Sequence, residues 1–149
     1  MSHWKPSISL AGFARFEDLA LLFCRLGTGV FLVHGVLDNI VDVRRMREFT
    51  DFVEVAGIAP ANFWAPFSVY TQFLAGILAI LGLWTRWAGA IIAITFVVAL
   101  GFVHWNQSLR EWWPALSLTL IGLIFLTHGA GKISLDRVLQ RRQVHLDNL

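Results

Sequence analysis

The chain has 149 residues, of which 56% are hydrophobic and only 15% are charged, and its mean hydropathy is +0.63. A soluble domain of this size could not cover so much apolar surface, so the composition excludes an ordinary soluble fold and indicates an integral membrane protein. The length allows a single transmembrane domain, residues 1–149, with no separate catalytic module. The basic residues lie at the ends of apolar runs and in the tail, which fits membrane lipids as partners and argues against nucleic acid.

The first apolar run covers residues 19–41, which is long enough for a span because a helix needs roughly 20 residues to cross the bilayer. A polar segment, residues 42–59, follows it. Four apolar residues in this segment recur every three positions, which predicts a short amphipathic helix at the membrane interface. They are Met46, Phe49, Phe52 and Val55.

Three further spans are predicted at about residues 62–84, 87–104 and 112–128. Only Thr85 and Arg86 separate the second span from the third, so these two helices must be antiparallel neighbours. The sequence therefore predicts an all-α integral membrane four-helix bundle with a short interfacial amphipathic helix between the first and second spans. Glycines in the first two spans indicate close helix packing; they are Gly27, Gly29, Gly35, Gly76 and Gly82.

The orientation of the bundle follows from the basic residues on each side of the membrane. One side has seven (Lys5, Arg15, Arg86, Lys132, Arg137, Arg141, Arg142) and the other has four (Arg44, Arg45, Arg47, Arg110). Because the more basic side faces the cytoplasm, both termini, including the tail of residues 132–149, are predicted to be cytoplasmic in a bacterial inner membrane.

Arg25 lies about one-third of the way along the first span, where an ionisable side chain is costly. It could reach back to the interface along its aliphatic stem. The alternatives are an ion pair inside the bundle and a site for an anionic lipid headgroup.

A second group of polar residues is expected in the outer half of the bundle. His34 and Asp38 are four residues apart and so share a helix face, where a carboxylate beside an imidazole suits proton transfer. The predicted topology places Gln72, His104 and Glu111 at the same end. We therefore take His34, Asp38, Gln72, His104 and Glu111 as a candidate catalytic cluster; hydrogen bonds that only hold the helices together are the alternative.

Metal and haem chemistry are not expected. Cys24 is the only cysteine, so the chain has no thiolate metal cluster. No HExxH motif is present, and the histidines of the spans lie at different depths, which disfavours a haem held by two histidines. No covalently bound cofactor is expected.

Several motifs in order resemble the DoxX family of small four-helix membrane proteins. The first is Arg25-Leu26-Gly27 with Phe31, His34 and Gly35 in the first span. The second is GILAILGLWTR, residues 76–86, and the third is HGAGKISLD, residues 128–136. The resemblance covers roughly residues 19–137, including His104 and Glu111.

The resemblance implies a membrane subunit associated with oxidoreductases, such as thiosulfate:quinone oxidoreductase and terminal quinol oxidase assemblies, with quinone as the possible cofactor. The chain has Asp38 where family members commonly carry a lysine, and Gln72 where they carry a glutamate. Two hypotheses stay open. The chain either contributes a quinone-facing or proton-handling site, or is a noncatalytic anchor or accessory subunit that docks a partner protein. The expected partner is another protein subunit or a second copy of the chain.

Overall fold

The computed structural model of the chain describes residues 11–103 and 107–146, and all regular secondary structure in this part is helical. A 3-10 helix, η1 (Ala11–Phe16), leads into α1 (Glu17–Val41). The remaining helices are α2 (Val43–Val55), α3 (Ala61–Leu81), α4 (Thr85–Phe102), α5 (Leu109–His128) and α6 (Leu135–Leu146). Four helical segments are long and apolar enough to cross a membrane: Gly12–Val41, α3, α4 and α5. The predicted all-α, four-span class is confirmed.

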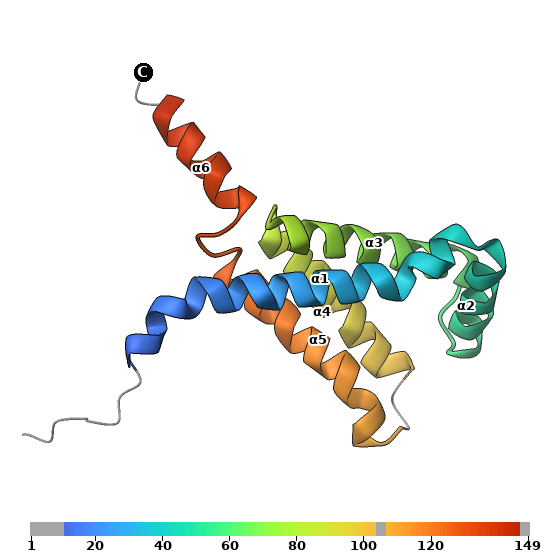
Figure 1. The fold of residues 1–149 in the computed structure, drawn as a ribbon. Coiled ribbons are helices and arrows are strands. Elements are labelled where there is room, and N and C mark those ends of the chain that lie inside the picture. The colour runs from blue at the N-terminus through green and yellow to red at the C-terminus, as the bar shows by residue number, and fades with distance from the viewer. Residues whose placement is uncertain (1–10, 104–106, 147–149) are drawn as a thin grey trace, which may run out of the picture.

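The four spans form two antiparallel hairpins. The helix α1 packs along α3, α4 packs along α5, and contacts between α3 and α4 join the two pairs. Figure 1 shows α1 and α3 side by side, with α4 and α5 behind them and running in a different direction. Both termini of the described chain and the α3–α4 turn lie toward one end of this arrangement, and α2 lies at the other.

Paired glycines set the closest approach within each hairpin. A Cβ atom added to Gly29 would lie 2.7 Å from the carbonyl oxygen of Gly76, and one added to Gly76 would lie 2.9 Å from that of Gly29. In the second hairpin a Cβ on Gly89 would lie 2.6 Å from the carbonyl oxygen of Gly122. Only residues without a side chain allow two backbones to come this close. Gly27 and Gly35, in contrast, are exposed, and a Cβ on either would meet open space.

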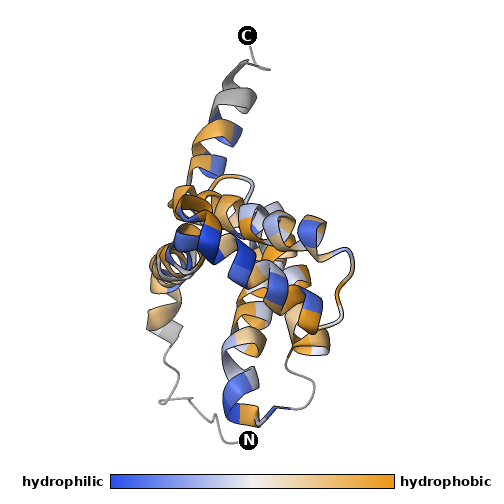
Figure 2. Cartoon of the chain, turned by 90° about the vertical axis from the view of Figure 1, so that its right-hand side faces the viewer, coloured by the Kyte–Doolittle hydropathy of each residue, from blue (hydrophilic) through white to orange (hydrophobic). Residues whose placement is uncertain are grey.

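All four spans contribute to one apolar core. Its buried members are Leu32, Ala75, Ala79, Ala88, Ile92, Leu118 and Phe125. The outer surfaces of the spans are apolar as well, with large side chains such as Phe23, Ile94 and Leu120 exposed. Figure 2 shows hydrophobic residues over much of the outside of the helices. This is the arrangement expected where lipid replaces water as the solvent.

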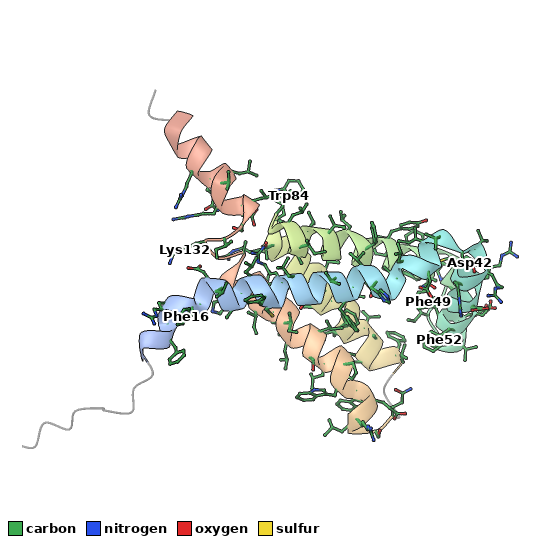
Figure 3. The ribbon with its side chains drawn as sticks, viewed as in Figure 1. Phe16, Asp42, Phe49, Phe52, Trp84 and Lys132 are labelled. Atoms are coloured by element: carbon green, nitrogen blue, oxygen red, sulfur yellow. The ribbon has the colours of Figure 1, made fainter. Side chains whose placement is uncertain are left out.

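The predicted interfacial helix is present as α2, which is shorter than the polar segment that contains it. Asp42 begins it, since its Oδ1 accepts a hydrogen bond from the Arg44 N–H at 2.8 Å. Val53 packs with Ala61 and Ala65 at the start of α3, which fixes the apolar side of α2. Phe52 remains 49% exposed, and Figure 3 shows it with Phe49 on α2, at the end of the bundle opposite Trp84 and Lys132.

The C-terminal tail contains a tight connection and a helix. Residues 129–134 form a tight connection that contains Gly129 and Gly131, both with positive φ angles (78° and 73°). The helix α6 follows and projects away from the spans (Figure 1).

Candidate functional site

His34 and Asp38 lie on the outer side of α1. Both are exposed, whereas Leu32 and Val36, on another side of the same helix, are buried. Asp38 Oδ1 accepts a hydrogen bond from the Asn39 N–H at 3.0 Å. Within the described residues no hydrogen bond or ion pair joins Asp38 to His34. The two side chains share a face, as their spacing requires, and the other described residues do not cover this face.

Gln72 is half-buried on α3, and its Nε2 donates a hydrogen bond to Ser68 Oγ at 2.9 Å, one turn earlier in the same helix. The amide thus has a local partner within α3. Among the residues that the structure describes, no hydrogen bond joins Gln72 to His34 or Asp38.

Glu111 lies in the first turn of α5 and completes a capping box with Ser108. Its Oε2 accepts hydrogen bonds from the Ser108 N–H at 2.9 Å and from Ser108 Oγ at 2.8 Å. This interaction stabilises the start of the helix. Since α5 packs against α4, and α1 packs against α3, Glu111 and His34 belong to different hairpins. His104, the fifth member of the predicted cluster, lies outside the described residues.

Arg25 is the most enclosed charged residue of the described chain, with 1% of its surface exposed. Its Nη1 donates to the carbonyl oxygen of Ala79 at 3.4 Å, and its Nη2 donates to the carbonyl oxygen of Ile133. Both hydrogen bonds go to backbone carbonyls of this chain, and no ion pair joins Arg25 to another described residue. The Ile133 carbonyl is within reach because residues 129–136 fold back over α1.

Glycine at position 82 makes room for this guanidinium. Gly82 has a left-handed conformation (φ 65°) at the end of α3, and a Cβ atom there would clash with Arg25 Nη1. The residue is required both for the turn and for the close approach of the arginine.

Asp136 connects the same region to α4. Its Oδ1 accepts from the Trp84 N–H at 2.8 Å and its Oδ2 accepts from the Thr85 N–H at 3.1 Å. The Asp136 N–H in turn donates to the carbonyl oxygen of Gly82 at 2.9 Å. A carboxylate at a helix N-terminus satisfies free N–H groups and interacts favourably with the helix dipole. It also attracts the nearby Arg25 guanidinium.

Lys132 joins the segment to the start of α1. Its backbone N–H donates to Asp18 Oδ1 at 2.8 Å, and its Nζ forms an ion pair with Asp18 Oδ2 at 3.0 Å. Figure 3 shows Lys132 and Trp84 at the end of the bundle where α6 begins. We refer to residues 129–136, which contact α1, the end of α3 and the start of α4, as the return segment.

Two polar atoms beneath the return segment have no hydrogen-bond partner among the described residues: Arg25 Nε and Thr85 Oγ1. An unpaired buried polar group costs about 1–3 kcal/mol. The return segment therefore satisfies most, though not all, of the polar groups around a buried arginine.

No curated protein and no solved structure matches this chain. The DoxX family model matches residues 20–105. The match begins in α1 and ends just beyond α4, so it includes three of the four spans, the Gly29–Gly76 crossing, and both Arg25 and His34. With its four apolar spans and this match over more than half of its length, the chain belongs to the DoxX family of small membrane proteins.

Proposed function

We propose that the chain is a membrane subunit of an oxidoreductase complex, in which His34 and Asp38 contribute a quinone-facing or proton-handling site. The observation that supports this proposal is the exposure of both side chains on a membrane-spanning helix. Ionisable residues at membrane depth usually face a protein interior or a polar cavity. A polar group from outside this chain would therefore cover them.

The position of His34 along α1 supports a role inside the membrane. It lies seven residues before Val41 (41 − 34 = 7), the last residue of α1, which corresponds to roughly 10 Å along the helix axis. This places the imidazole inside the span, with Asp38 one turn closer to its end. Such a pair leads from the apolar region toward the surface, which suits proton transfer to or from a membrane-soluble redox carrier.

The chemistry of a quinone requires a route for protons. Reduction of a quinone to a quinol takes up two electrons and two protons, and only the protons need a path through side chains. An imidazole and a carboxylate on successive turns of one helix face are both groups that can carry a proton along such a route. Electrons would come from a redox subunit of the complex, because this chain has no expected electron carrier of its own.

A noncatalytic anchor or accessory subunit is the second candidate. The local roles of Gln72 and Glu111 favour it, because both residues of the predicted cluster already serve their own helices. In that case the uncovered face of α1 would dock a partner protein, and Gly27 and Gly35, where a Cβ would meet open space, would allow close approach of another helix.

Copurification tests the proposed assembly. The chain should be isolated in mild detergent from its native membrane, and proteins and small molecules in the sample identified by mass spectrometry. A redox subunit together with a quinone is the expected result. A redox subunit or another partner protein without quinone would favour the accessory function, and the absence of any partner protein would contradict both candidates.

The bacterial inner membrane and the cytoplasmic location of both termini are part of the same proposal. They rest on the seven-to-four distribution of basic residues between the two sides. Single cysteines at Ser2 and Gln143, in a Cys24→Ser background, should react with an impermeant maleimide only after cells are opened. A cysteine at Glu48 on α2 should react in intact cells, and the reverse pattern would contradict the orientation.

A further inference from the structure

The helix α6 has an apolar side that nothing in the described chain covers. Three of its large apolar residues share one face of the helix, and all are exposed: Leu135 (43%), Val138 (50%) and Leu139 (47%). Ile133, directly before the helix, is 49% exposed. Arg137 and Arg141 are also exposed and lie four residues apart on a different side. Figure 2 shows both hydrophobic and hydrophilic residues along this helix.

The start of α6 is fixed relative to the spans. Asp136, in its first turn, binds the N–H groups of Trp84 and Thr85 at the beginning of α4. Ser134 Oγ accepts from the Arg137 N–H at 3.3 Å and donates to the carbonyl oxygen of Gly131 at 2.9 Å. The helix therefore begins beside the start of α1, the end of α3 and the start of α4. It cannot lie far from the bilayer.

Exposed tryptophans mark the depth of this end. Trp84 is 65% exposed and Trp87 is 71% exposed, and indole side chains prefer the headgroup region of a bilayer. Since Asp136 is hydrogen-bonded directly to the Trp84 N–H, the first turn of α6 lies close to the same level. An amphipathic helix that starts there can place its apolar side among the acyl chains by lying along the surface.

The basic residues at the end of the bundle where α6 begins indicate the kind of lipid surface that this helix would bind. Arg86, Lys132, Arg137 and Arg141 are all exposed on it. Two of the nearby carboxylates are already engaged: Asp18 pairs with Lys132, and Asp136 caps α4. Basic residues next to a span attract anionic lipid headgroups, and long arginine side chains reach them while their stems lie along apolar surface.

We propose that α6 is a membrane-surface helix that docks on anionic lipid, with Leu135, Val138 and Leu139 inserted at the interface and Arg137 and Arg141 bound to lipid phosphates. The inference does not depend on the proposed oxidoreductase function. It uses only the position, the exposure and the charge of α6.

Fluorescence of the full-length protein in lipid nanodiscs tests this docking. In a Cys24→Ser background, an environment-sensitive dye is attached to a single cysteine at Val138 or at Gln140. Val138 lies on the apolar side of α6, and Gln140 is an exposed polar residue of the same helix. Nanodiscs contain either phosphatidylcholine alone or a mixture with phosphatidylglycerol, and quenching is measured with aqueous iodide and with lipid-attached nitroxide.

In phosphatidylglycerol discs the Val138 dye should be shielded from iodide and quenched by nitroxide, while the Gln140 dye stays accessible to iodide. Arg137→Gln with Arg141→Gln should lower the ratio of docked to free helix by about fivefold for each arginine removed. The matched control is Arg44→Gln with Arg45→Gln, which removes two exposed arginines from α2 at the opposite end and should leave the Val138 signal unchanged.

Three results would overturn the proposal. The proposal requires shielding of the Val138 dye to depend on both the lipid charge and the two arginines. Full access of iodide to this dye in both disc types would show that the helix is not docked. Equal shielding in both disc types, unchanged by the arginine substitutions, would show that α6 is covered without any need for anionic lipid. Energy transfer between Val138 dyes on two copies in one disc would identify a second chain as the occupant.

Discussion

Arg25 and Ile133, which are 108 positions apart in the chain, are joined by a hydrogen bond from the guanidinium Nη2 to the backbone carbonyl oxygen. The bond links the first span to the segment that follows the last one. Since Arg25 also binds the carbonyl oxygen of Ala79 on α3, a single side chain holds three parts of the chain together.

Replacement of Arg25 should therefore destabilise the whole bundle. Arg25→Leu removes both hydrogen bonds and leaves two carbonyl oxygens unpaired, and we expect a loss of about 2–4 kcal/mol in the free energy of unfolding. Arg25→Lys should lose less, because an ammonium group can still donate to one of the carbonyls. Thermal unfolding in detergent measures both variants. An unchanged melting temperature for Arg25→Leu would contradict the structural role of the arginine.

Asp136 should act together with Arg25, because both hold the return segment. Asp136→Ala removes the acceptors for the Trp84 and Thr85 N–H groups, and a cost of about 1–2 kcal/mol is typical for a lost helix cap. Asp136→Asn keeps one acceptor and should cost less. In a double-mutant cycle with Arg25→Leu, the combined loss should be smaller than the sum of the single losses. Additive losses would show that the two residues stabilise the fold independently.

The two glycines of α4 provide a matched pair for testing helix packing. Gly89→Ala would place a Cβ 2.6 Å from the Gly122 carbonyl oxygen, so α4 and α5 must move apart and the protein should be destabilised. Gly101→Ala, in the same helix, meets nothing within 4 Å and should be neutral or slightly stabilising. Melting temperatures in one detergent compare them directly. Equal effects would contradict the close crossing of the two helices.

His34 and Asp38 should be tested at matched complex abundance, where a chemical defect can be separated from an assembly defect. If they form one proton-handling unit, His34→Ala and Asp38→Asn should each lower quinone-linked activity. The double variant should then lose little more than the worse single variant. The control is His128→Ala, which removes another exposed histidine of a span from the opposite end of the bundle. Normal activity in both single variants would favour the accessory-subunit function.

The sequence predicted the spans well because lipid imposes a length and a composition on any helix that crosses it. It also predicted α2, whose regularly spaced apolar residues include Phe49 and Val55. It did not predict which side of α1 is buried, because the lipid-facing and bundle-facing residues are equally apolar. Arg25 and His34 are nine residues apart, which puts them on different sides of a helix, and the structure shows that the arginine faces inward and the histidine outward.

The return segment could not be predicted for a different reason. Its residues were recognisable as a motif, HGAGKISLD, and Arg25 was recognisable as an unusual residue in a span. The connection between them depends on how the two hairpins bring residues 25, 79 and 133 together, which is a tertiary relationship without a local signal. The helix α6 was likewise not predicted from the sequence, because its few apolar positions lie in a charged segment and give only a weak helical pattern.

The partners of Arg25 also impose an order on the synthesis of the chain. Its guanidinium belongs to the first span, while Ala79 lies on the second and Ile133 beyond the fourth. A ribosome has therefore delivered the charge to the membrane long before either carbonyl exists. During this interval water, headgroups or the insertion machinery must solvate the arginine. The return segment, made after all four spans, completes its enclosure, so the environment of this one side chain changes once Ile133 has been added.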